Sequence, residues 1–117
     1  MSNWEIWHNP RCSKSRQTLQ LLEDNNIEPN VRKYLEDPPS AEQLGLVLEW
    51  LGMEPLELVR TKEALFKELG LKGADLSRDE WIQTMVANPK LIERPVVIHG
   101  EQAAVGRPPE NVLTLLS

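Results

Sequence analysis

The sequence contains a single cysteine, Cys12, among 117 residues. One cysteine cannot form an internal disulfide, and small secreted domains usually carry several, so we expect a reducing compartment, the cytoplasm. Enzymes with a Cys-x-x-Cys motif resolve their own mixed disulfides, but here Ser15 stands at the position of the second thiol. Any two-electron thiol reduction must therefore take its second sulfur from another molecule.

The sequence also lacks an excess of basic residues and long hydrophobic runs. The net charge of −5 argues against a nucleic-acid-binding protein. No apolar run approaches the roughly 20 residues of a transmembrane helix, and no basic leader precedes an apolar stretch, so we expect neither membrane association nor a signal peptide. The two histidines, His8 and His99, and the one cysteine show no zinc-site spacing, so we expect no metal. The role of His99 is left open.

Hydrophobic periodicity predicts a βαβ unit at the start of the chain, formed by a strand, a helix and a second strand at residues 4–7, 15–23 and 30–35. Helical patterns follow over residues 40–88, where Ser40 and Ser77 are expected to cap two of the helices.

A hairpin and a final helix are expected after this helical stretch. The hairpin strands lie at residues 95–98 and 103–105, and the proline-rich segment 106–109 begins the helix. The order βαβ, helices, ββα predicts an α/β, thioredoxin-like fold with a four-stranded mixed sheet. We expect one domain, residues 1–117, with a helical insertion over about 38–90.

Cys12 is predicted to lie at the start of the first helix. The unpaired N–H groups and the dipole of a helix start favour negative charge, and such positions lower a thiol pKa from about 8.5 to roughly 3.5–7.5. Residues 1–18 carry Arg11, Lys14 and Arg16 against Glu5 alone, a net charge of +2. A lone cysteine is often only a small buried hydrophobe, but these polar flanks favour a reactive thiolate beside a small-anion site.

Several neighbours are candidates for a role at this sulfur. His8 is expected to add positive charge, and the Ser15 hydroxyl, one helical turn beyond Cys12, to donate a hydrogen bond to the thiolate. We count Arg16 among the substrate-binding residues. We expect the four tryptophans to be core residues more often than ligand contacts.

Pro95 is expected to be a cis proline. In a thioredoxin-like fold the loop that enters the third strand holds a cis proline and faces the first helix start, and Pro95 falls at that point. Arg94 would then reach the sulfur from the opposite wall, where a planar guanidinium suits an oxyanion.

The run His8-Asn9-Pro10-Arg11-Cys12-Ser13-Lys14-Ser15-Arg16 resembles the active-site signature of the glutaredoxin-coupled arsenate reductases, the ArsC family. The segments Glu93-Arg94-Pro95 and Gly106-Arg107-Pro108-Pro109 also resemble later motifs of that family, and the resemblance extends over residues 5–115. The chain ends soon after its final helix, as in the shorter branch of the family.

The resemblance implies that Cys12 is the nucleophile, that His8 and Ser15 tune it, and that Arg60, Arg94 and Arg107 bind the oxyanion. It also implies reduction of arsenate to arsenite through a thiolate–arsenic adduct, with glutathione as co-substrate, no bound cofactor and transient contact with glutaredoxin. We expect a monomer.

Two other functions are compatible with these features. Spx-type regulators share the fold and bind RNA polymerase, although they often carry the Cys-x-x-Cys sensor that Ser15 removes here. The other alternative is a glutathione-dependent thiol oxidoreductase that acts on protein mixed disulfides.

Overall fold

The computed structural model describes residues 3–116, which form two compact units. One unit combines the chain up to Asp37 with the chain from Arg94, and the other is the segment Pro38–Glu93. The first unit holds β1 (Trp4–Trp7), α1 (Ser13–Asp24), β2 (Asn30–Arg32), β3 (Val96–His99), β4 (Gln102–Val105) and the 3₁₀ helix η2 (Pro109–Leu116). The second holds α2 (Ala41–Leu51), α3 (Pro55–Leu58), α4 (Ala64–Glu68), α5 (Arg78–Ala87) and the 3₁₀ helix η1 (Pro89–Leu91).

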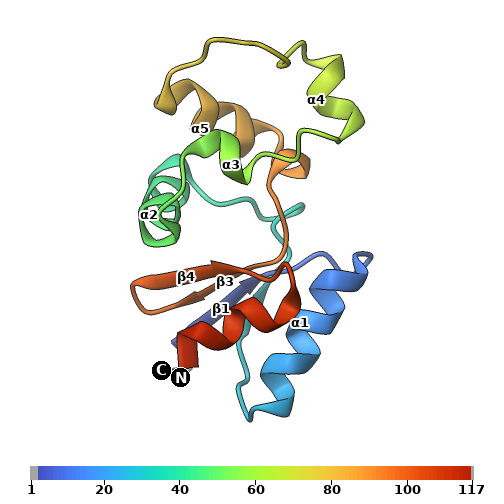
Figure 1. Ribbon diagram of the computed structural model, residues 1–117, viewed down its shortest axis with the longest axis vertical. Helices are drawn as coiled ribbons and strands as arrows, with labels where there is room; N and C mark the ends of the chain where they lie inside the picture. Colours follow the sequence, from blue (N-terminus) through green and yellow to red (C-terminus); the bar gives the residue numbers. More distant parts are fainter. Residues whose placement is uncertain (1–2, 117) are drawn as a thin grey trace. The chain divides into compact units, whose positions relative to one another are not determined.

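The four strands form one mixed sheet in the order β2-β1-β3-β4. β1 runs parallel to β2 and antiparallel to β3, which pairs with β4 as a hairpin. Helices α1 and η2 lie beside each other against this sheet (Figure 1). The element order and the mixed sheet confirm the predicted thioredoxin-like α/β fold.

The core of the sheet unit lies between the strands and these two helices. Buried residues of this core come from the strands β1, β3 and β4 and from the helices α1 and η2. The core residues are Ile6, Leu22, Ile27, Val97, Ala104, Val112 and Leu115. Alternate residues of β1 and β3 therefore face α1 and η2, as the pleat of a strand requires. This packing holds the start of α1 in place relative to the sheet.

The second strand is shorter than predicted. The alternating pattern extends to Leu35, but β2 ends at Arg32, and the N–H groups of Glu36 and Asp37 both donate to the Lys33 carbonyl. The Arg32 side chain closes this turn, because its Nε donates to the Asp37 carbonyl over 2.9 Å. Residues 33–37 are thus a turn at the end of the sheet.

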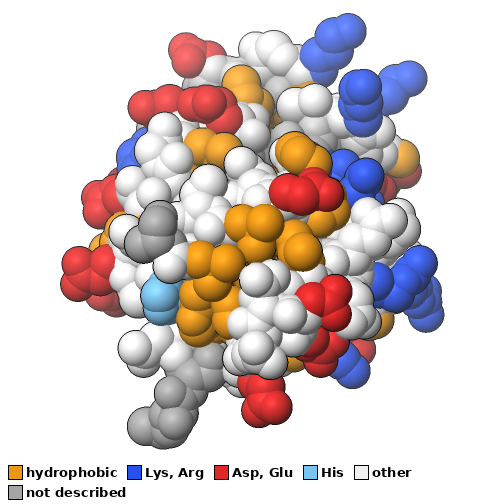
Figure 2. All heavy atoms as spheres, turned by 60° about the horizontal axis from the view of Figure 1, so that its bottom comes forward, with side chains coloured by type: hydrophobic (Ala, Val, Ile, Leu, Met, Phe, Trp, Pro, Cys, Tyr) orange, Lys and Arg blue, Asp and Glu red, His pale blue; other side chains and the backbone are white. Residues whose placement is uncertain are grey.

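His99 has structural contacts in the sheet unit. Its ring stacks on Trp4 with centroids 4.0 Å apart, and its Nδ1 lies 3.1 Å from the Leu115 carbonyl oxygen. Figure 2 shows one face of the molecule, on which hydrophobic side chains gather with charged side chains around them. These contacts give His99 a packing role near the end of η2.

The elements of the helical unit are all helices, as the sequence predicts for residues 40–88. Ser40 and Ser77 each form a capping box, with Gln43 at α2 and with Glu80 at α5. The helix α3 was not expected from the sequence.

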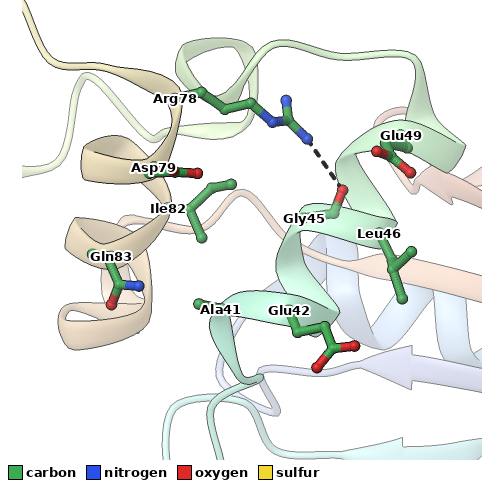
Figure 3. Close-up of a pocket in the computed structure, with 9 residues that line it drawn as sticks. All are labelled: Ala41, Glu42, Gly45, Leu46, Glu49, Arg78, Asp79, Ile82 and Gln83. Atoms are coloured by element: carbon green, nitrogen blue, oxygen red, sulfur yellow. Dashed lines mark hydrogen bonds between the residues drawn. The ribbon is translucent and has the colours of Figure 1, made fainter.

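Helices α2 and α5 flank a groove of about 470 Å³, across which the Arg78 Nη2 donates to the Gly45 carbonyl over 3.3 Å (Figure 3). Within the described residues, no helix combines the length and apolar composition that crossing a bilayer requires.

Candidate active site

Cys12 is the N-cap residue of α1. The loop that leaves β1 turns sharply before it, because the Cys12 N–H donates to the Asn9 carbonyl over 2.9 Å. The Cys12 carbonyl accepts from the Arg16 N–H, so the first helical turn begins at the cysteine itself. The residue is 8% exposed, which keeps it largely out of water. Its side chain thus occupies the place where a cap oxygen would accept from the helix amides.

The surroundings of Cys12 favour the thiolate. Burial raises the pKa of Cys12, but the backbone amide of Ser15, the charge and hydrogen bond of Arg94, and the backbone amide of Lys14 together outweigh burial. The pKa therefore lies below the ordinary value for cysteine. A thiolate of this kind is a nucleophile at neutral pH.

The origin of the positive charge differs from the prediction. Arg11, Lys14 and Arg16 were expected to supply it, but the side chain that lowers the pKa of Cys12 is that of Arg94, and Lys14 acts through its backbone amide. The Arg16 guanidinium instead donates from Nη1 to the Pro10 carbonyl over 2.9 Å, which secures the loop before the cysteine. Local charge density therefore did not identify the cation that acts on the sulfur.

His8 and Ser15 form a buried pair. The His8 Nδ1 lies 2.6 Å from the Ser15 Oγ, which also accepts from the Asn9 N–H over 3.0 Å. Burial, followed by the charges of Lys33 and Arg16, lowers the pKa of His8, so its imidazole is neutral at pH 7. His8 therefore adds no charge at neutral pH, contrary to expectation. The hydroxyl of Ser15 bonds to His8 and its backbone amide acts on the sulfur, and the expected hydrogen bond from that hydroxyl to the thiolate stays a prediction.

The buried neutral state of His8 predicts a loss of stability in mild acid. Because the folded pKa lies below the unfolded value of about 6.5, the unfolded chain binds more protons in the window between these values. The free energy of unfolding should fall as pH drops below about 6.5, until it reaches the folded pKa. Urea unfolding at about pH 7.5 and about pH 5.5 measures the difference, which should shrink in His8→Gln. Equal losses in both proteins would contradict the assignment.

Arg94 and Pro95 enter the site from the start of β3. The Arg94–Pro95 peptide bond is cis, and the Arg94 side chain bonds to Cys12. The segment after β4 holds these two residues by their carbonyl groups: the Gly106 N–H donates to Pro95, and the Arg107 Nε donates to Arg94, both over 2.9 Å. Arg107 thus contacts the backbone of Arg94, and its predicted binding of an oxyanion stays a prediction.

Gly106 was not predicted as a site residue, although it supports Pro95. A Cβ at this position would lie 2.5 Å from the Thr18 Oγ1 and 2.8 Å from the Pro95 Cγ. Thr18 is fully buried in α1, and its hydroxyl donates to the Lys14 carbonyl over 2.8 Å. The close approach of α1, Pro95 and the segment after β4 therefore requires a residue without a side chain. In the sequence, the only indication of this role was that a glycine precedes Arg107.

Replacing Gly106 with alanine is expected to destabilise the fold. The added methyl overlaps Thr18 and Pro95, and overpacking of this kind typically costs about 1–3 kcal/mol. Urea unfolding measures the loss. Gly45→Ala is the matched control, because a Cβ there lies 3.9 Å from the Ile82 Cδ1 and alanine in a helix interior gains about 0.5–1 kcal/mol. A Gly106→Ala protein as stable as the wild type would refute the packing argument.

Arg60 lies in the helical unit, directly after α3. Its N–H donates to the Leu91 carbonyl over 2.7 Å, and its Nη1 forms an ion pair of 2.9 Å with the Glu63 carboxylate. Glu63 also pairs with Lys90 over 3.4 Å. The role of Arg60 as an oxyanion ligand stays a prediction. Within residues 3–116, no group of three or more histidine, cysteine or acidic side chains is placed to hold a metal ion.

Comparison with known proteins bears on this site. The family model of the ArsC family matches residues 7–115. The uncharacterized protein YfgD of Escherichia coli K12 is 53% identical, over 96% of this chain and 95% of its own. An arsenate reductase of Haemophilus influenzae is 45% identical, over 95% and 97%. A solved arsenate reductase from Vibrio cholerae superposes with a TM-score of 0.91 at 51% identity, over 95% of both chains. The chain, with its Cys12 thiolate and its Arg94 at the cis proline, belongs to the ArsC family.

Proposed function

We propose that this chain is an oxidoreductase that reduces arsenate to arsenite, with the Cys12 thiolate as nucleophile and glutathione and glutaredoxin as the source of electrons. The observation that carries the proposal is the lowered pKa of Cys12 at the N-cap of α1, beside the Arg94 guanidinium. Relatives named arsenate reductase at 45% and 43% identity support the choice of oxyanion.

The first step uses the groups around the sulfur. The Cys12 thiolate attacks arsenic(V), so that an S–As bond forms and one oxygen leaves as water after protonation. Arg94, which already acts on the sulfur, offers a planar donor to the oxygens, whose charge must be stabilised. The neutral His8 and Ser15 pair keeps the loop before Cys12 in place through the Asn9 N–H.

The later steps need two external thiols, because the chain has one cysteine. Glutathione forms a second S–As bond and displaces a second oxygen as water. A glutaredoxin thiolate then attacks the glutathione sulfur; the S–As bond breaks, its electron pair stays on arsenic, and the mixed disulfide leaves. Arsenic is thereby reduced to arsenic(III). Water cleaves the remaining S–As bond, which releases arsenite and restores the Cys12 thiolate.

The experiment is an arsenate-dependent NADPH oxidation assay with glutathione, glutaredoxin and glutathione reductase. We expect turnover that requires all three components and arsenate together. Omission of glutaredoxin tests the coupling separately from the choice of oxyanion. Turnover without glutathione, or none with the complete mixture, would contradict the proposal.

A further inference from the structure

A second pocket lies beside the loop that carries Cys12. Residues 8–11, which follow β1, form one wall, and Lys33, Leu35 and Glu36 of the turn after β2 form the other, around a volume of about 400 Å³. β1 and β2 are parallel, so both walls stand at the carboxyl end of the two strands. This is the end of a parallel sheet at which ligands generally bind.

The shape of the pocket is maintained by hydrogen bonds on both walls. Asn9 accepts the Arg11 N–H on its Oδ1 and the Cys12 N–H on its carbonyl, so the first wall is joined directly to the cysteine. The second wall is the turn that Arg32 closes by donating to the Asp37 carbonyl. Both walls of the pocket are therefore held by the chain's own hydrogen bonds.

The pocket is larger than a tetrahedral oxyanion requires, and Arg94 does not line it. Volumes of about 300–1,000 Å³ are typical of sites for small organic ligands. Its exposed walls carry two cations, Arg11 and Lys33, and one anion, Glu36. Pro10 and the half-exposed Leu35 add apolar surface between these charges. Two cations and one anion complement a molecule with two carboxylates and one ammonium group.

We propose that this pocket binds the small peptide thiol that reduces the Cys12–arsenic adduct, a molecule with two carboxylates and one ammonium as in glutathione. This inference rests on the glutathione coupling proposed above. Arg11 and Lys33 hold the carboxylates, Glu36 holds the ammonium, and the ligand backbone lies on Pro10 and Leu35. The pocket adjoins the residue that carries the adduct, because Asn9, in its wall, accepts the Cys12 N–H on its carbonyl.

Binding of S-methylglutathione, an unreactive analogue, tests the pocket without arsenate turnover. Titration followed by backbone amide NMR should shift the resonances of residues 8, 9 and 11 and of residues 33–36 in the wild type. Lys33→Ala should weaken binding about tenfold, as the loss of one charge-assisted hydrogen bond does. Lys62→Ala, another exposed lysine, is the matched control and should bind as the wild type does.

Kinetics separates this proposal from the proposed function. Lys33→Ala should raise the KM for glutathione about tenfold while the KM for arsenate stays unchanged. Arsenate turnover with unchanged glutathione KM and unchanged S-methylglutathione binding would overturn the pocket and leave the function standing. Binding that Lys33→Ala weakens, without arsenate turnover, would uphold the pocket and reject the oxyanion. Shifts confined to other residues would also overturn it.

Discussion

Replacing Cys12 with serine is expected to reduce arsenate turnover to background while the protein still folds. A serine hydroxyl is not ionised at neutral pH and is a weak nucleophile without an adjacent base, so the S–As bond that begins the reaction has no counterpart. Serine is, however, a preferred N-cap residue, so it can replace Cys12 at the N-cap of α1 without disrupting the helix. The variant should therefore still fold and unfold cooperatively in urea.

The two measurements for Cys12→Ser are the NADPH-coupled assay and urea unfolding. Lost turnover in a protein that still folds identifies a residue needed for the chemistry, whereas replacement of a residue needed for packing would reduce both turnover and stability. Ser13→Ala, at the first helical position beside it, is the matched control and should retain turnover. Turnover in Cys12→Ser would exclude this sulfur as the nucleophile.

Replacing Arg94 with alanine is expected to slow turnover about 10²–10³-fold, as the loss of one preorganised donor typically does. The same change should raise the pKa of Cys12, because the charge and the hydrogen bond of Arg94 both lower it. The pH dependence of alkylation by iodoacetamide measures that pKa. In the wild type its midpoint should lie below the ordinary thiol value of about 8.5.

Two variants separate the contributions of Arg94. Arg94→Lys keeps the positive charge but loses the planar fork, so the thiol pKa should stay close to that of the wild type while turnover falls. Arg78→Ala is the matched control, because that guanidinium donates to the Gly45 carbonyl in the helical unit, and the pKa of Cys12 should not change. A wild-type rate and an unshifted thiol pKa in Arg94→Ala would remove Arg94 from the site.

Part of the fold was predictable because its signals are local. The capping box of Ser77 and Glu80 joins residues three apart, and the positive φ of Gly52 ends α2 where the sequence indicates. The second strand was predicted too long because alternation alone does not report a turn. In the structure Glu36 and Asp37 bond back to Lys33, and this ends the strand at Arg32.

The site was predictable only in part. The position of Cys12 at a helix start follows from the residues around it, and the cis Pro95 and the approach of Arg94 were inferred through the fold. The charges that act on the sulfur were not predicted from the sequence. A nearby arginine such as Arg16 looks like a partner of the sulfur in sequence, yet its guanidinium bonds to the Pro10 carbonyl.

The sequence by itself determined the succession of the strands and of every helix it predicted, α3 excepted, together with the caps of α2 and α5 and the placement of one thiol at the start of α1. Each of these depends on residues within a few positions. Only the tertiary structure decided which groups act on that thiol. Arg94 is more than eighty positions from Cys12, and Gly106 approaches Thr18 from a comparable separation. Such pairs meet because the sheet and α1 pack on one core, and no short-range pattern encodes that meeting.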